Sequence, residues 1–270
     1  MLTVTLSKKQ ILKARREIQQ RIQSTRPLKD PQFHARYIGS VNHEDRNPDE
    51  QSKLKYLGLS AAQTAELAHS KYSFSKLPIE DQIPIWLDLY HSSSIHDEMV
   101  VALNYLTHSK HERFILANAQ HVFALQNKSD NWAISDTVSS LIAQLIESDP
   151  AKHLPRLKKW NASKNPWERR QSLVGLYCYA HSRKRHLPVK HSLPLVRNRV
   201  QDSHYFVQKA VGWCLREIYQ IDSKAQKRFV SQHVGQLSST AFTTAIEKYS
   251  PTERTAIKKQ RAVARKNLKM

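Results

Sequence analysis

A tryptophan and an aspartate stand four residues apart in the stretch DNWAISD, residues 130–136, of a chain that is otherwise strongly basic. If this stretch is helical, Trp132 and Asp136 share one face. A fixed carboxylate stabilises positive charge that develops during a reaction, and an indole ring attracts cations through its π face. The pair is therefore a candidate site for a positively charged substrate. The alternatives are a core tryptophan and an aspartate that caps or pairs within a helical framework.

A second group of residues combines aromatic rings with cations. One predicted helix carries Trp167 and Arg170 three residues apart. The next predicted helix has a stripe at i, i+4, i+8 and i+11 spacing, made of Tyr205, Lys209, Trp213 and Arg216. Its opposite face is apolar, with Phe206, Ala210, Cys214 and Ile218. Cations neutralise phosphates and aromatic rings stack on bases, so this stripe is expected to face nucleic acid. For Trp167 and Arg170 the alternatives are core packing and a structural ion pair.

The charge of the chain points to a polyanionic partner. The net charge is +20, and residues 151–270 alone hold 26 Lys and Arg against 6 Asp and Glu, whereas residues 78–150 hold 3 against 10. Nucleic acid is the first candidate, and a basic protein without a polyanion ligand is the alternative. The mean hydropathy of −0.61 and the absence of a long uncharged apolar run give no support for a membrane span. Metal-ligand, phosphate-loop and nucleophile motifs are absent from the sequence, so a metal site is not expected, and nucleotide hydrolysis and acyl transfer have no support.

The elements that must position these residues are predicted to be helices. Glycine is scarce, with 5 in 270 residues, and no Asn-Gly or Asp-Gly hairpin dipeptide occurs. Apolar residues recur at helical spacing, as in the stripe Ile11, Ala14, Ile18 and Ile22. Residues 153–174 align with residues 192–213 at an offset of 39, and a further step of that length places Asn131 opposite Arg170. Two helices per roughly 40 residues is the HEAT period.

The predicted fold is an all-α, HEAT-like solenoid of stacked helix pairs with a basic concave groove. We expect one helical domain over residues 1–270. It comprises a basic N-terminal helix and polar loop (1–52, with the loop at 39–52), a repeat core (53–235) and basic C-terminal helices (236–270). Cys178 and Cys214 lie in apolar, helix-like surroundings and are expected to be reduced core residues.

Three stretches, in their order and spacing, resemble the AlkD-like DNA alkylation-repair glycosylases: DNWAISD (130–136), NPWERRQSLVGLY (165–177) and YFVQKAVGWCLREIY (205–219). A looser similarity begins at YLGLSAAQTAELAHSKY (56–72), and the resemblance covers about residues 50–235. It implies a HEAT-like α-solenoid that excises cationic N3- and N7-alkylated purines from duplex DNA without a metal or cofactor. The expected partner is double-stranded DNA with alkylated bases, and the protein is expected to be a monomer in the bacterial cytoplasm, associated with the nucleoid.

The resemblance also implies roles for individual residues. Asp136 matches the catalytic aspartate, and Trp132 and Trp213 match the tryptophans beside the damaged nucleotide. The DNA-binding role falls to residues of the two later helices, namely Trp167, Arg169, Arg170, Tyr205, Lys209 and Arg216. We expect the Asp136 carboxylate, the Trp213 indole and the Arg170 guanidinium to converge on one cationic nucleoside.

Two other functions remain open. A non-catalytic HEAT-repeat module that binds DNA or RNA structure would keep Arg170, Lys209 and Arg216 but would not need Asp136. A protein-binding scaffold of the importin type would show little salt-dependent affinity for DNA, whereas a DNA groove predicts a steep dependence on salt.

Overall fold

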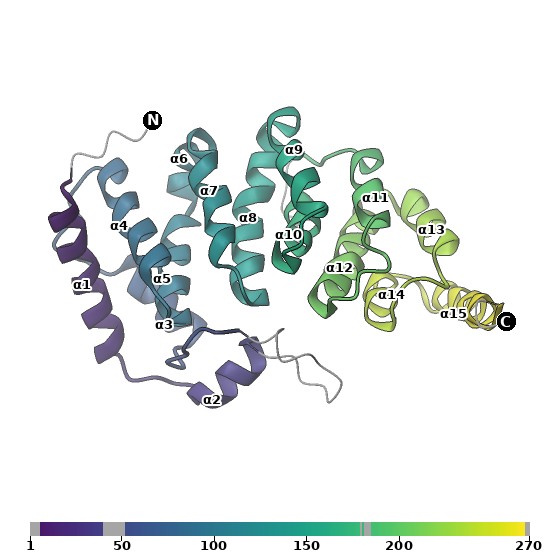
Figure 1. Ribbon diagram of the computed structural model, residues 1–270, viewed down its shortest axis with the longest axis horizontal. Helices are drawn as coiled ribbons and strands as arrows, with labels where there is room; N and C mark the ends of the chain where they lie inside the picture. The colour runs from purple at the N-terminus through teal and green to yellow at the C-terminus, as the bar shows by residue number, and fades with distance from the viewer. Residues whose placement is uncertain (1–5, 40–51, 179, 181–184, 268–270) are drawn as a thin grey trace. The chain divides into compact units, whose positions relative to one another are not determined.

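The computed structural model describes residues 6–39, 52–178, 180 and 185–267 (Figure 1). Within these ranges the chain forms α-helices with short 3₁₀ and π turns and no strand, apart from a single parallel β-bridge between Lys55 and Ile95. The predicted all-α class is confirmed. The predicted loop at 39–52 lies almost entirely outside the described residues. The chain divides into two compact units, residues 1–141 and 142–270, and the boundary falls inside helix α8.

The first unit is built from short helices around an aromatic and aliphatic core. Its elements are α1 (Lys8–Ser24), α2 (Pro31–His34), the π turn η1 (Ala35–Gly39), α3 (Ala61–His69), α4 (Ile79–Ser92), α5 (His96–Leu106), η3 (Ser109–His111), α6 (Glu112–Ala117), α7 (Ala119–Leu125), η4 (Gln126–Lys128) and the start of α8 (Trp132–Ser148). Helix α4 packs against α1 and α5, and α3 packs against α5. Ala14, Ile18 and Ile22 are buried, as the helical spacing predicts.

A tight backbone contact holds the segment that leads into α2. The Lys29 N–H donates to the Gly58 carbonyl at 2.9 Å, and Gln63 Nε2 donates to the Arg26 carbonyl at 2.8 Å. Gly58 has φ +86°, and a Cβ on it would lie 2.4 Å from the Lys29 carbonyl oxygen. Only glycine tolerates both the positive φ and this close approach. The N-terminal segment is therefore fastened to the body of the first unit before α2 begins.

The second unit consists of helix pairs, and the second helices of successive pairs pack on one another in a row. Its elements are the rest of α8, α9 (Pro150–Asn161), α10 (Pro166–Tyr177), α11 (Val189–Arg197), α12 (Tyr205–Ile221), α13 (Ser223–Gln232), α14 (Ser239–Ala245) and α15 (Pro251–Asn267). Helix α10 packs on α12 and α12 packs on α14, while α9, α11 and α13 each pack against a member of that row. This is the packing expected of a solenoid-like all-α fold. At Gly212 on α12, a Cβ would lie 2.6 Å from the Ala241 carbonyl oxygen, so glycine permits close contact with α14.

The predicted 39-residue offset holds between two helix pairs but not before them. Helices α9 and α11 begin at Pro150 and Val189, and α10 and α12 begin at Pro166 and Tyr205. Helix α8, however, begins at Trp132, only 34 residues before α10. The predicted alignment of Asn131 with Arg170 is therefore wrong by five residues. The equivalent position, the fifth residue of each helix, is Asp136 in α8, Arg170 in α10 and Lys209 in α12.

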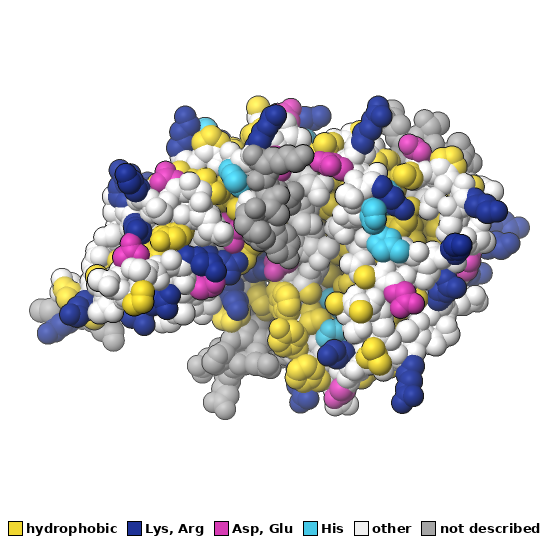
Figure 2. Space-filling model, turned by 180° about the vertical axis from the view of Figure 1, so that it is seen from behind, with side chains coloured by type: hydrophobic (Ala, Val, Ile, Leu, Met, Phe, Trp, Pro, Cys, Tyr) yellow, Lys and Arg dark blue, Asp and Glu magenta, His cyan; other side chains and the backbone are white. Residues whose placement is uncertain are grey.

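The surface agrees with the charge expected from the sequence. Lysine and arginine side chains are spread over the face seen in Figure 2, and acidic side chains are fewer. No described helix has both the length and the apolar character that a membrane crossing requires.

Candidate functional site

The first turn of α8 is set by its cap. Asn131 is buried, and its side-chain Oδ1 accepts from the Ile134 N–H at 3.0 Å. An asparagine at the N-cap satisfies one of the unpaired N–H groups of the first helical turn. The preceding Asp130 carboxylate accepts from Ser52 Oγ and from the Lys53 N–H, both at 2.9 Å. These contacts fix both the start of α8 and the direction of its first side chains.

Trp132 and Asp136 lie one turn apart at that start. Both are half-buried, whereas Ile134, Val138 and Leu141 on the same helix are completely buried. The pair therefore occupies the partly exposed side of α8, as the spacing predicts. An aromatic ring and a carboxylate at adjacent positions on a partly exposed helix face can both contact a cation bound there.

Tyr37 is the neighbour of Trp132 that sequence reasoning missed. The Trp132 Nε1–H donates to the Tyr37 carbonyl oxygen at 3.3 Å, and the two rings meet edge to face, with centroids 5.8 Å apart and planes at 88°. Tyr37 belongs to the π turn η1, and π-helical turns occur often at functional sites. The available signal was the four-residue spacing of Phe33 and Tyr37 in an otherwise polar segment.

Trp167 and Arg170 are buried within the second unit. The Trp167 ring lies 5.1 Å from the Phe206 ring and 6.0 Å from the His204 ring. Arg170 Nη1 donates to the Phe206 carbonyl at 3.0 Å, and the guanidinium lies over the Phe206 ring. Both side chains join α10 to the start of α12. These contacts give both residues a packing role. Their predicted contact with DNA stays a prediction.

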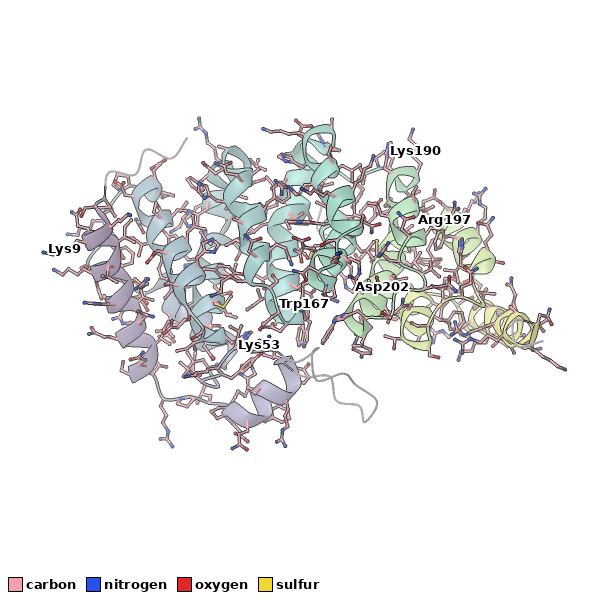
Figure 3. The ribbon with its side chains drawn as sticks, in the orientation of Figure 1. Lys9, Lys53, Trp167, Lys190, Arg197 and Asp202 are labelled. Carbon is pink, nitrogen blue, oxygen red and sulfur yellow. The ribbon has the colours of Figure 1, made fainter. Side chains whose placement is uncertain are left out.

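Arg169 is held by an acid that the sequence reasoning did not identify. Its Nε donates to Asp202 Oδ2 at 2.7 Å and its Nη2 donates to Asp202 Oδ1 at 3.1 Å, while Nη1 donates to the carbonyls of Ser163 and Lys164. Burial raises the pKa of Asp202, but hydrogen bonds from Arg169 and from the His204 N–H lower it more, so the net pKa is below its ordinary value. Trp167, at the start of α10, and Asp202, before α12, are labelled in Figure 3. The guanidinium of Arg169 is thus committed to an ion pair.

The stripe on α12 has the predicted arrangement. Lys209 Nζ lies over the Tyr205 ring at 5.8 Å, and the Arg216 guanidinium lies over the Trp213 ring at 5.6 Å. The opposite side is buried as predicted, with Phe206, Ala210, Cys214 and Ile218. Lys209 is exposed, and Tyr205, Trp213 and Arg216 are half-buried. Cations and rings therefore alternate along one partly exposed face.

The two cations of this stripe differ in their acidic neighbours. Arg216 Nη2 donates to Glu217 Oε1 at 3.1 Å, and its Nη1 donates to Glu247 Oε2 at the same distance. Glu247 belongs to the turn after α14, so its pairing with Arg216 was not foreseen from the sequence. Lys209 has its Tyr205 contact and an exposed ammonium group. It is the residue of the stripe best placed to meet a phosphate.

The predicted site residues thus form two sets, each described within its own unit. Trp132 and Asp136 lie in the first unit, and the remaining candidates lie in the second. Their predicted convergence on one nucleoside stays a prediction. Among the residues that the structure describes, no three His, Cys, Asp or Glu side chains are grouped to hold a metal ion.

Comparison with known proteins identifies a family. The family model described as DNA alkylation repair enzyme matches residues 18–249. A solved structure described as a predicted DNA alkylation repair enzyme from Enterococcus faecalis has a TM-score of 0.54 and 15% sequence identity, and the match covers 78% of this chain and 100% of that chain. At this identity the likeness supports the fold. No curated protein matches the chain significantly.

Proposed function

This chain belongs to the family of DNA alkylation repair enzymes, and from that premise we propose that it is a monofunctional DNA glycosylase. It hydrolyses the N-glycosidic bond of cationic N3- and N7-alkylated purines in duplex DNA, the first step of base excision repair. It acts as a monomer on alkylated DNA in the bacterial cytoplasm, at the nucleoid. The reaction as proposed requires no metal and no cofactor.

The observation that carries this proposal is the placement of Asp136 one turn from Trp132 on the partly exposed side of α8. An alkylated purine already carries a positive charge and departs as a neutral base. Breakage of its bond to C1′ builds oxocarbenium character on the sugar, as in other glycoside hydrolyses. The Asp136 carboxylate stabilises that charge and orients the water that attacks C1′. No general acid is needed, because the leaving base does not require protonation.

The aromatic residues bind the cationic parts of the substrate. A cation over a tryptophan face is stabilised by about 0.5–2 kcal/mol. Trp132 lies beside Asp136 on α8, and we assign it to the face of the damaged nucleotide. We assign Trp213 to the same substrate, with Arg216 beside its ring at 5.6 Å. The interaction favours the alkylated purine over the neutral one, since only the former carries the charge.

The basic residues of the second unit hold the DNA backbone. Lys209 is exposed, and residues 151–270 carry a net charge of +20. Lysine and arginine that neutralise phosphates supply most of the affinity for DNA without reading sequence. We assign this role to Lys209 and Arg216 on α12, with Tyr205 beside them. We assign Arg169, Arg170 and Trp167 on α10 to the DNA as well, and their contacts also fix α10 against the start of α12.

The test is release of free base from duplex DNA that contains N7-methylguanine. Wild type is expected to release the base, and Asp136→Asn is expected to lose at least a hundredfold in single-turnover rate while it still binds the duplex. Glu80→Gln is the matched control, because Glu80 is an exposed acid on α4 of the same unit. Normal release by Asp136→Asn would refute the catalytic assignment. Duplex binding by a wild type that releases no base would favour the non-catalytic binding module instead.

A further inference from the structure

An exposed aromatic pair lies on the N-terminal segment of the first unit. Phe33 and Tyr37 are each 55% exposed, and their rings stack on one another, with centroids 6.1 Å apart and planes 4° apart. Tyr37 in turn meets Trp132 edge to face. We call these three residues the aromatic patch. Figure 2 shows hydrophobic side chains gathered at the lower edge of the molecule in the region of α2. Single exposed apolar residues are common on proteins, but a contiguous aromatic surface marks an interaction site.

The aromatic patch is held in place by contacts on both sides. Asp30 caps α2 by accepting from the Gln32 N–H at 2.9 Å, and Lys29 is fastened to Gly58 through the backbone. At the other end, the Tyr37 carbonyl accepts from the Trp132 indole. Because the backbone around Phe33 is fixed in this way, the fold itself keeps the Phe33 side chain exposed. A ligand that binds there therefore costs little conformational entropy of the protein backbone.

The charges around the aromatic patch indicate the class of ligand. Arg26 and Lys29 are exposed in the same short segment, whereas its single acid, Asp30, serves as the cap of α2. Planar rings among cations suit a nucleobase, which stacks on the ring while its phosphates meet the cations. An apolar protein partner or a second copy of the chain would favour a larger apolar area with fewer charges.

We propose that the aromatic patch is a nucleobase-stacking surface, and that Phe33 stacks on an unstacked base of the DNA held at Asp136. This inference rests on the proposed function in one respect, that DNA is the partner. Bases in an intact duplex have no free face, so the surface would recognise DNA in which stacking is disturbed. Phe33 thus contributes affinity and structural preference, while Tyr37 positions both Phe33 and the Trp132 indole.

The test compares two duplexes of undamaged DNA, one fully paired and one with a single-nucleotide bulge that carries 2-aminopurine. Stacking of the bulged base on Phe33 is expected to quench its fluorescence. Wild type is expected to bind the bulged duplex more tightly than the paired one. Phe33→Ala is expected to lose roughly five- to a hundredfold in affinity for the bulged duplex, the effect of one base–aromatic stack, and little for the paired duplex. Phe33→Trp should restore both affinity and quenching.

Leu28→Ala is the matched control, because Leu28 is 69% exposed on the same segment and its side chain is apolar but not aromatic. Equal losses in Leu28→Ala and Phe33→Ala, or unchanged binding of the bulged duplex by Phe33→Ala, would overturn the inference. So would a wild-type dimer in sedimentation that Phe33→Ala dissociates, since the patch would then be covered by a second copy. The assay involves no base release, so a failure of the glycosylase proposal would leave its readout intact.

Discussion

Arg169 donates two hydrogen bonds to the Asp202 carboxylate, at 2.7 and 3.1 Å, and this ion pair connects α10 to the turn before α12. Both side chains are largely buried, at 14% and 4% exposed. Arg199 adds a third contact to the same carboxylate at 3.3 Å. The pair aligns the start of α12, which carries Tyr205 in its first turn and Lys209 one turn later.

Removal of the Asp202 charge should therefore destabilise the second unit. Asp202→Asn leaves the Arg169 guanidinium buried without its counter-charge, and a loss of about 3 kcal/mol in the free energy of unfolding is expected. Urea denaturation monitored by circular dichroism measures it. Glu112→Gln, an exposed acid on α6, serves as the control and should change stability by less than about 0.5 kcal/mol. Equal stability of Asp202→Asn and wild type would show that the ion pair contributes nothing net.

Lys209 should account for part of the salt dependence of DNA binding. If it meets one phosphate, Lys209→Ala lowers the slope of log K against log salt concentration by about one. Fluorescence anisotropy with a duplex over a range of salt concentrations measures this slope. Lys248 is a suitable control, since it is also an exposed lysine of the second unit but pairs with Glu247 at 3.2 Å. A slope that changes equally in Lys209→Ala and Lys248→Ala would refute a specific phosphate contact at Lys209.

Acid should destabilise the first unit through two buried histidines. Burial lowers the pKa of His96 to about 3 and that of His111 to about 4, against 6.5 in the unfolded chain. Below pH 6.5 the unfolded state therefore binds more protons than the folded state, and stability falls as the pH falls toward 4. Each histidine contributes a loss on the order of 2 kcal/mol or more over that range.

Replacement of His111 should reduce this acid sensitivity. Both ring nitrogens of His111 are buried, and neither has a hydrogen-bond partner among the described residues; the ring packs 4.5 Å from that of Tyr105. His111→Phe removes the titrating group with little change in ring size, so stability should change less between pH 6.5 and 4 than in wild type. Denaturation midpoints across that range test the prediction. His191→Phe, at an exposed position on α11, should leave the pH dependence as it is.

The contact between α12 and α14 should not tolerate a side chain at Gly212. A Cβ there would approach the Ala241 carbonyl oxygen to 2.6 Å and would also lie 2.9 Å from Thr244 Cβ. Gly212→Ala is therefore expected to lower the free energy of unfolding by about 1–3 kcal/mol, even though alanine favours helix more than glycine. Thermal melting measures the effect. A Gly212→Ala variant that melts at or above the wild-type temperature would show that α14 moves to accommodate the methyl group.

The helices themselves could be predicted because their signals are local. Scarce glycine and apolar residues at helical spacing are signals between near neighbours in the sequence, and the alignment of two stretches gave the 39-residue offset of α9 and α10 to α11 and α12. The preceding step was misjudged because one side chain, the Asn131 cap, decides where α8 begins. A shift of five residues replaces Asn131 by Asp136 as the counterpart of Arg170.

The sequence by itself determined the all-α class, the apolar side of α12, and the placement of Trp132 and Asp136 one turn apart on the partly exposed side of α8. Only the tertiary structure decided which cations are held in ion pairs or buried hydrogen bonds and which remain exposed. Arg170 and Lys209 are both fifth residues of their helices, yet one is buried against the Phe206 carbonyl and the other is exposed. The reason is physical: whether a polar or aromatic side chain stays exposed depends on partners from distant parts of the chain, such as Asp202 beside Arg169 and Tyr37 beside Trp132. Helical periodicity carries no information about these partners.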